Sequence, residues 1–235
     1  MAAYKYLLLD TDNTLFDFDR AEETAFYAVF SALGISVTPA VYKRYHEIND
    51  DLWRKLERKE VTREWLKDLR YELLLDEMGI SDTDLAKKIS QLYFSMIGQQ
   101  RFLLPGALDV CRNLSETYPM YIITNGSYKP QRSRFIGSGL EPYFRDVFIS
   151  EKIGAEKPSS AFFNHVMQSV GDADTSQYLV VGDSLTSDMD GAILAGMDAV
   201  WLDRSGSRNT RGRDIPYIID DIRELPALLL RITEK

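Results

Sequence analysis

The chain begins with a short apolar run that stops at acidic residues. Tyr6-Leu7-Leu8-Leu9 is followed directly by Asp10-Thr11-Asp12. A short apolar run bounded by turn-forming residues predicts a buried β-strand, here over residues 4–9. Two carboxylates this close repel each other and attract a cation. The same residues also suit an ordinary turn, so this stretch alone leaves both interpretations open.

Residues 17–99 show a helical spacing of apolar positions. Thr38-Pro39 is a typical helix start, and Gly34 a typical helix end. The periodicity predicts four helices, at about 19–33, 38–57, 62–79 and 81–96. This part of the chain is therefore predicted to be a small all-helical bundle.

Beyond residue 105 the predicted helices and strands alternate. Strands are predicted at 120–124, 147–149, 178–181, 199–201 and 217–219, and helices at 106–116, 130–138, 159–170, 187–195 and 222–232. Such alternation predicts an α/β fold with a doubly wound parallel sheet. Because the strand at 4–9 has to join that sheet, we expect a core domain of residues 1–16 and 100–235 and an inserted helical domain of residues 17–99.

Composition narrows the class of protein. Of the 235 residues 45% are hydrophobic, which is enough for a buried core, and the net charge is −8. Non-specific nucleic-acid binding depends on clustered lysine and arginine, so we expect no nucleic-acid partner. The single Cys111 lies among apolar residues and is expected to be a buried structural thiol. We find no signal-peptide pattern and no apolar run of about 18 residues, so we expect a soluble cytoplasmic protein without a membrane partner.

Chemistry-bearing residues gather where predicted strands end. In open α/β sheets ligands bind outside the carboxyl ends of the strands. Three strand ends and the start of one helix supply such residues: Asp10 and Asp12, Thr124 and Asn125, Asp183 and Asp188, and Lys157. Carboxylate and other oxygen ligands suit a hard cation, and a phosphate is its natural companion.

Four short motifs carry a resemblance to a known superfamily. Asp10-Thr11-Asp12-Asn13-Thr14, Ile123-Thr124-Asn125-Gly126, Lys157-Pro158 and the stretch from Gly182-Asp183-Ser184 to Asp188 occur in this order. They resemble the four ordered motifs of the haloacid dehalogenase superfamily, and the helical insertion resembles its cap. The resemblance covers nearly the whole chain and implies a Rossmann-like core with a helical cap domain.

The resemblance implies roles for individual residues. Asp10 would be the nucleophile that attacks phosphorus. Asp12 would be the general acid and then the general base, and its backbone carbonyl would ligate Mg²⁺. Asp10 and Asp183 would supply carboxylate ligands to the metal, with Asp188 in support.

The phosphate group would have its own partners. Thr124 and Asn125 would hold phosphate oxygens, and Lys157 would offset the charge between nucleophile and phosphate. Haloacid dehalogenases lack an acid at the position of Asp12, and P-type ATPases carry threonine there. The resemblance therefore favours phosphatases and phosphomutases, which keep this residue.

A subgroup resemblance suggests the substrate. Thr14-Leu15-Phe16-Asp17-Phe18-Asp19, Ile122 to Gly126 and Trp201-Leu202 are similar to stretches of bacterial 5′-nucleotidases. This implies hydrolysis of nucleoside monophosphates. Phe18 and Tyr128, each close in sequence to a motif, are the candidate substrate contacts.

Three hypotheses follow. The first is a Mg²⁺-dependent phosphomonoesterase working through Asp10, most simply a nucleoside 5′-monophosphatase and otherwise a phosphatase for another small ester such as phosphoglycolate. The second is an isomerase of the β-phosphoglucomutase kind, and the third is a noncatalytic binding module. The release of free phosphate separates the first from the second. We expect a monomer or a homodimer that binds a small phosphate ester.

Overall fold

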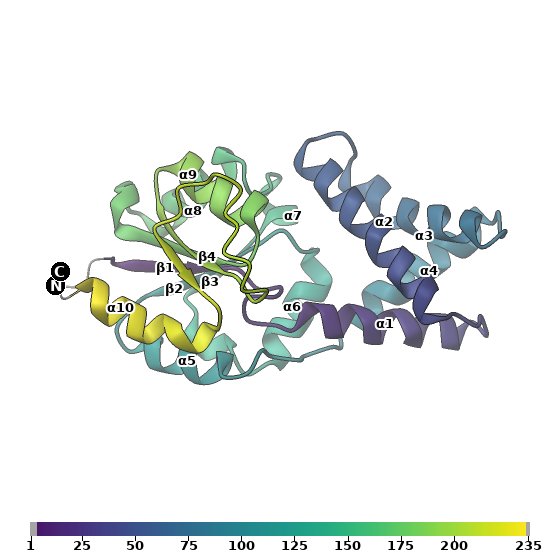
Figure 1. Ribbon diagram of the computed structural model, residues 1–235, viewed down its shortest axis with the longest axis horizontal. Helices are drawn as coiled ribbons and strands as arrows, with labels where there is room; N and C mark the ends of the chain where they lie inside the picture. Colours follow the sequence, from purple (N-terminus) through teal and green to yellow (C-terminus); the bar gives the residue numbers. More distant parts are fainter. Residues whose placement is uncertain (1–3, 234–235) are drawn as a thin grey trace. The chain divides into compact units, whose positions relative to one another are not determined.

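Six parallel strands form the sheet of the larger of two structural units (Figure 1). The computed structural model describes residues 4–233. The strands are β1 (Tyr6–Leu9), β2 (Met120–Thr124), β3 (Asp146–Ile149), β4 (Tyr178–Gly182), β5 (Asp198–Leu202) and β6 (Tyr217–Ile219). Their order is β3-β2-β1-β4-β5-β6, so the first strand in sequence lies between β2 and β4. This confirms the predicted doubly wound α/β fold.

The side chains of β1 alternate between two apolar clusters, one on each face of the sheet. Leu7 and Leu9 lie in one cluster, and Tyr6 and Leu8 lie in the other. Because consecutive residues of a strand point to opposite faces, a strand buried on both sides must be apolar throughout. Helices cover both faces (Figure 1), with α5 (Ala107–Ser115) and α10 (Leu225–Thr233) on one and α8 (Ser160–Val170) and α9 (Asp190–Ala195) on the other.

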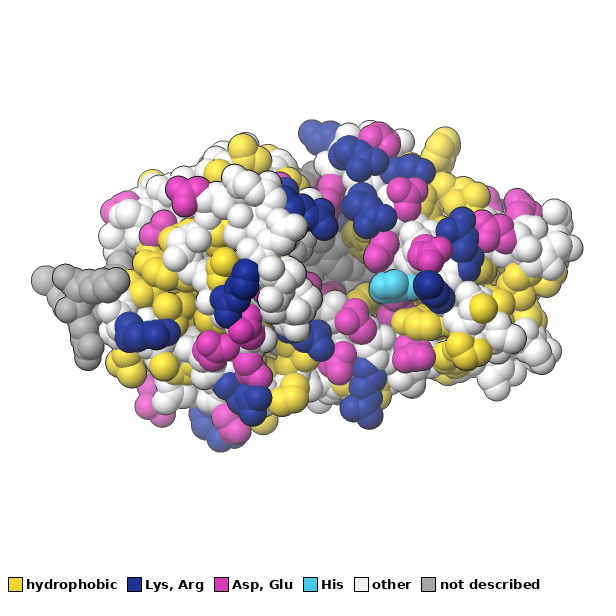
Figure 2. Space-filling model, viewed as in Figure 1, with side chains coloured by type: hydrophobic (Ala, Val, Ile, Leu, Met, Phe, Trp, Pro, Cys, Tyr) yellow, Lys and Arg dark blue, Asp and Glu magenta, His cyan; other side chains and the backbone are white. Residues whose placement is uncertain are grey.

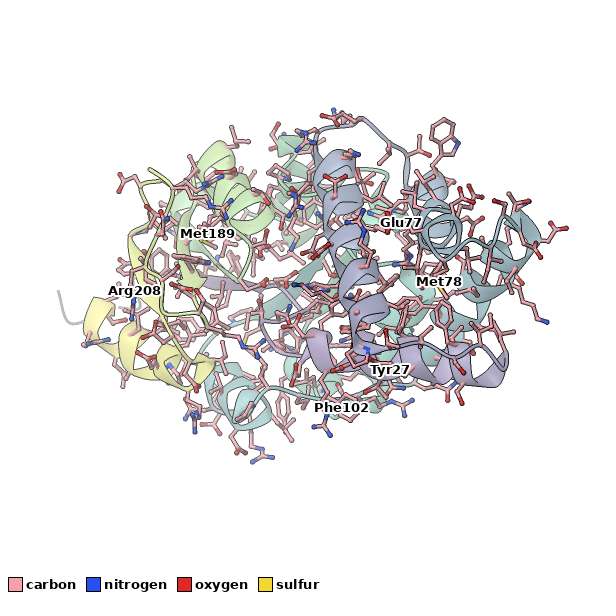
Figure 3. The ribbon with its side chains drawn as sticks, turned by 45° about the vertical axis from the view of Figure 1, so that its right-hand side comes forward. Tyr27, Glu77, Met78, Phe102, Met189 and Arg208 are labelled. Atoms are coloured by element: carbon pink, nitrogen blue, oxygen red, sulfur yellow. The ribbon has the colours of Figure 1, made fainter. Side chains whose placement is uncertain are left out.

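The apolar clusters on the two faces of the sheet include Met189 and Cys111. Met189, labelled in Figure 3, packs in the same cluster as Phe163 of α8. Cys111 is buried in the opposite cluster, and burial raises the pKa of its thiol to about 12. The thiol is therefore a structural side chain of the core, as predicted.

Several helical segments of the larger unit differ from the prediction. The helix predicted at 187–195 is a π-helical turn, Leu185–Met189, followed by the shorter α9. A four-residue helix, α7 (Ser150–Ile153), follows β3 and was missed because it is too short to show a helical period. Helix α6 (Tyr128–Gly137) begins two residues earlier than predicted.

The second unit consists of Asp19–Gln100. Its helices are α1 (Phe18–Ala32), α2 (Pro39–Glu57), α3 (Arg63–Glu77) and α4 (Thr83–Ile97). The last three begin at polar caps, since the side chains of Thr38, Thr62 and Asp82 accept hydrogen bonds from backbone amides in the first turn. The two units divide after Phe18 and after Gln100, whereas the sequence placed the boundaries after residues 16 and 99.

A buried polar network joins three helices of this second unit. Glu22 of α1 is fully buried, and its carboxylate accepts a hydrogen bond from Asn49 Nδ2 at 2.9 Å and contacts His46 Nδ1 at 2.8 Å. Arg70 of α3 donates to Asn49 Oδ1 at 3.0 Å. A buried carboxylate is costly unless it is paired and hydrogen-bonded, so these partners are needed for Glu22 to lie inside the bundle.

Replacing His46 by glutamine is expected to remove a pH dependence of stability. The hydrogen bond to Glu22 raises the pKa of His46 from 6.5 to about 9. A cation with a raised folded-state pKa stabilises the fold fully below its unfolded pKa, and this contribution is lost as pH rises through the folded pKa. We therefore expect the melting temperature of the wild type, measured by calorimetry, to fall between pH 6.5 and pH 9. The His46→Gln variant should show a flatter profile.

The matched control is His165→Gln in α8 of the other unit. This variant should keep the wild-type profile. If the melting temperatures of His46→Gln and the wild type fell by the same amount over this pH range, the ion pair between His46 and Glu22 would not contribute to the pH dependence of stability. We expect the fall in melting temperature to differ only modestly between the wild type and His46→Gln. The His46 side chain is 42% exposed, so solvent screens its ion pair with Glu22.

Charge on the surface is mixed. On the face shown in Figure 2, acidic side chains lie among the lysines and arginines, so neither sign of charge covers that face alone. Within residues 4–233, no helix combines the length and the apolar character that crossing a bilayer requires.

Candidate active site

Three neighbouring strands deliver the predicted site residues to one edge of the sheet. Asp10 follows β1 and donates its backbone amide to Val181 O of β4 at 2.9 Å. Thr124 is the last residue of β2, and Asp183 follows β4. Since β1 lies between β2 and β4, the three strand ends meet beside the point where the winding direction reverses. This is the position at which open α/β sheets bind ligands.

Lys157 joins two of the acidic residues. Its side chain is 1% exposed, and its Nζ donates to Asp10 Oδ1 at 2.7 Å and to Asp188 Oδ1 at 2.6 Å. The third hydrogen bond of the ammonium goes to Ile123 O at 3.0 Å. An ammonium has three N–H donors, so Lys157 is fully satisfied and fixed in place.

Asn125 holds the backbone of Lys157. Asn125 Nδ2 donates to Lys157 O at 2.8 Å, and Lys157 N donates to Asn125 Oδ1 at 2.9 Å. These two bonds connect the loop after β2 with the segment before α8. The predicted contact between Asn125 and a phosphate remains a prediction, and the structure adds this supporting contact.

Asp10, Asp183 and Asp188 form a carboxylate cluster. Each offers one oxygen, and these oxygens lie within 4.8 Å of one another. The π-helical turn brings Asp188 back over the end of β4, where its Oδ2 accepts a hydrogen bond from Ser184 N at 3.1 Å. A Cβ at Gly182 would overlap the Asp188 carboxylate, so this approach requires glycine at the strand end.

The cluster carries more negative charge than Lys157 neutralises. Burial raises the pKa of Asp10 to about 7 even though Lys157 opposes the shift. Burial also raises the pKa of Asp183 well above its ordinary value, and the charges of Asp10 and Asp188 add to this. For Lys157 the carboxylates outweigh burial and raise its pKa. Three oxygen donors and uncompensated negative charge fit a hard divalent cation such as Mg²⁺.

Thr124 lies in a network of polar groups beside the cluster. Thr11 Oγ1 donates to Thr124 Oγ1 at 2.9 Å, and Gly126 N donates to the same oxygen at 3.1 Å. Gln131 Nε2 donates to it at 3.2 Å. The sequence placed Thr124 at this edge, and its contact with phosphate remains a prediction.

Among the residues that the structure describes, the Asp12 side chain binds residues of α6 and not Lys157 or the carboxylate cluster. Its Oδ1 accepts a hydrogen bond from Arg134 Nη1 at 2.6 Å, and its Oδ2 accepts one from Gln131 Nε2. Within the described residues the Asp12 side chain is not part of the carboxylate cluster. Arg134 and Gln131 were missed by sequence reasoning. The available signal was two polar residues one helical turn apart, directly after the second motif.

Phe18 and Tyr128, the two candidate substrate contacts, are the first residues of α1 and α6. Phe18 is half-buried, and its ring centre lies 5.5 Å from Arg134 Cζ. Tyr128 is half-buried at the start of α6, with Lys152 Nζ 4.3 Å from its ring centre. Contact of either ring with a substrate remains a prediction.

A parallel doubly wound sheet with a buried lysine-linked carboxylate cluster at the ends of β1 and β4 defines a class of hydrolase. The sequence profile of the haloacid dehalogenase-like hydrolases matches residues 4–196. The chain belongs to this family, as the motifs predicted, and it is an enzyme of the hydrolase class.

Among its relatives are named hydrolases and nucleotidases. The HAD-hydrolase YfnB of Bacillus subtilis is 36% identical over 97% of this chain and 95% of its own length. The pyrimidine 5′-nucleotidase PynA of Streptococcus pneumoniae is 36% identical over 84% of this chain and 83% of its own. The pyrimidine 5′-nucleotidase YjjG of Escherichia coli is 27% identical over 97% and 99%.

A solved structure agrees closely with the fold. The crystal structure of YfnB bound to magnesium matches this chain with a TM-score of 0.90 and 33% identity. The match covers 97% of this chain and 99% of that one. The similarity therefore extends over both structural units.

Proposed function

We propose that the protein is a Mg²⁺-dependent phosphomonoesterase that works through Asp10 and acts on nucleoside 5′-monophosphates. The observation that carries the proposal is the placement of Asp10. It is buried at the end of β1, held by Lys157 and grouped with Asp183 and Asp188. A carboxylate held in this way supports the proposed role of Asp10 as the nucleophile that attacks phosphorus.

In the proposed first step an Asp10 carboxylate oxygen bonds to phosphorus while the ester P–O bond breaks. The leaving alkoxide takes a proton from Asp12. In the second step the Asp12 carboxylate removes a proton from water, whose oxygen attacks phosphorus, and the bond between Asp10 and phosphorus breaks. The products are an alcohol and inorganic phosphate, and Asp10 returns to its starting state.

The other residues of the edge would bind and orient the phosphate. Lys157 places a positive charge against Asp10, and Thr124 and Asn125 lie at the end of β2, where they would meet phosphate oxygens. Asp10, Asp183, Asp188 and the Asp12 backbone carbonyl would hold Mg²⁺. Bound there, the cation would neutralise charge that develops on the transferring phosphoryl group.

The substrate class rests on the relatives. Two of them are named pyrimidine 5′-nucleotidases, and they match most of this chain. The unit Asp19–Gln100 is proposed to be the cap domain that selects among phosphate esters. Phe18 and Tyr128 of the other unit are proposed as aromatic contacts of the substrate.

A phosphate-release screen tests this proposal. The purified protein, supplied with Mg²⁺, should release phosphate from nucleoside 5′-monophosphates faster than from sugar phosphates or phosphoglycolate. Conversion of β-glucose 1-phosphate to another sugar phosphate, with little free phosphate, would favour a mutase instead. A preference for phosphoglycolate would keep the mechanism but replace the substrate. No release from any ester would overturn the proposal.

A further inference from the structure

Helix α6 turns two polar side chains toward the sheet. Gln131 and Arg134 are one helical turn apart, so they lie on the same face of the helix. Gln131 is 4% exposed and Arg134 is 1% exposed. Burying an amide and a guanidinium is costly unless both find polar partners.

Both side chains meet Asp12, one at each carboxylate oxygen. Arg134 Nη1 donates to Oδ1 at 2.6 Å, and Gln131 Nε2 donates to Oδ2. A single bond would leave the carboxylate free to rotate about it. Two bonds to different oxygens fix both the place and the plane of the group.

Arg134 is itself immobilised by aromatic rings. Its Cζ lies 4.5 Å from the ring centre of Phe16 and 5.5 Å from that of Phe18. Phe16 is fully buried and belongs to the same loop as Asp12. A guanidinium stacked in this way keeps its orientation and loses little entropy when it binds a carboxylate.

Gln131 connects Asp12 to the end of β2. The same Nε2 that binds Asp12 also donates to Thr124 Oγ1 at 3.2 Å. A Cβ at Gly126 would overlap the Gln131 side chain, so the glycine after Asn125 leaves the space that the amide occupies. The position of Asp12 is thereby coupled to the loop that would bind phosphate.

We propose that Arg134 and Gln131 are positioning residues that hold the Asp12 carboxylate where it exchanges protons with the leaving group and the water. The inference rests on the proposed function, since the acid–base role of Asp12 belongs to it. Neither residue is proposed to touch the substrate. Arg134 is proposed to act through Asp12, and this limits which reactions its loss can slow, whereas Gln131 also contacts Thr124.

The leaving group provides the first test. The 5′-alkoxide of a nucleotide needs a proton as it departs, whereas p-nitrophenolate leaves without one. Arg134→Met should therefore lower kcat for the nucleoside monophosphate by roughly 10- to 100-fold, with KM little changed. The first-turnover burst of p-nitrophenolate from p-nitrophenyl phosphate should change by less than about threefold. An equal loss with both esters would overturn the proposal.

A double-mutant cycle provides the second test. If Arg134 acts through Asp12, then adding Arg134→Met to Asp12→Asn should cost little more than Asp12→Asn alone. A general structural role would lower activity by the same factor in both backgrounds. Arg134→Lys keeps the charge but not the two-pronged shape, and it should recover part of the lost kcat.

Two further variants serve as a control and as an alternative in the tests of Arg134. Arg132→Met, an exposed arginine of the same helix, is the matched control and should behave as the wild type. Gln131→Met removes the second contact without changing the charge, and it replaces Arg134→Met in both tests if that variant does not fold. Because Gln131 also donates to Thr124, Gln131→Met should slow both esters, and the nucleoside monophosphate more than p-nitrophenyl phosphate.

Crystal structures separate this inference from the proposed function. In the Arg134→Met protein the Asp12 carboxylate should leave its wild-type position or become disordered, a readout that needs no turnover. An unmoved carboxylate would overturn the positioning role even in an active enzyme. If the wild type releases no phosphate from any ester, the proposed function fails, and the crystal comparison still decides whether Arg134 positions Asp12.

Discussion

Asp10→Asn is expected to abolish phosphate release, by roughly 10⁴-fold or more, because the variant lacks the nucleophile. Asparagine has almost the same size, so the geometry around Lys157 and the carboxylate cluster should persist. Burial already raises the pKa of Asp10 to about 7, which shows that its charge is unfavourable in the metal-free protein. The melting temperature of the metal-free variant should therefore not fall while its activity disappears.

The measurement is phosphate release from the best ester of the screen, together with a thermal melt. The matched control is Asp109→Asn, an aspartate on α5 whose side chain is 78% exposed, and it should keep full activity. Substantial phosphate release by Asp10→Asn would exclude Asp10 as nucleophile. A large fall in melting temperature would instead mean that the loss of activity reports unfolding.

Asp183→Asn is expected to give the second large effect, a loss of affinity for Mg²⁺. Asp183 is one of three carboxylates whose oxygens lie within 4.8 Å. Removing one of these charges should weaken metal binding by more than the roughly 10- to 100-fold that is typical of a residue that only supports a ligand. Calorimetric titration of Mg²⁺ or Mn²⁺ measures this directly, and the Mg²⁺ concentration for half-maximal activity should rise in parallel.

The affinity for Mg²⁺ measured by this titration should also depend on pH. Since the pKa of Asp10 is raised to about 7 in the metal-free protein, metal must displace a proton below that pH. Metal affinity should therefore increase as pH rises through about 7. Asp190→Asn is the matched control, because Asp190 pairs with Arg213 and lies outside the cluster. Unchanged Mg²⁺ affinity in Asp183→Asn would remove this residue from the metal site.

The strand ends could be predicted because they depend on local pattern. Apolar runs that stop at Asp10, Thr124 and Asp183 identify buried strands and the residues that follow them. Parallel strands that neighbour one another deliver such residues to one edge whatever the details of packing. The family, the fold and the residues that lie at this edge of the sheet could therefore be predicted from the sequence.

The contacts among these residues could not be predicted in the same way. Arg134 and Asp12 are 122 positions apart, and their ion pair depends on how α6 is rotated against the sheet. A helical pattern with few apolar residues does not fix that rotation. The contact between His46 and the fully buried Glu22 is similar, because it joins two helices and depends on how they pack against each other.

The sequence by itself thus determined the order of the elements and the residues at the carboxyl edge, including Asp10, Lys157 and Asp183. Local periodicity and turn chemistry encode these features, and the motifs add their family. Only the tertiary structure decided what each side chain bonds to. In the structure Asn125 hydrogen-bonds to the backbone of Lys157, and Asp12 binds two side chains of α6. The sequence permits many partners for each side chain, and helix rotation and packing between distant segments select among them.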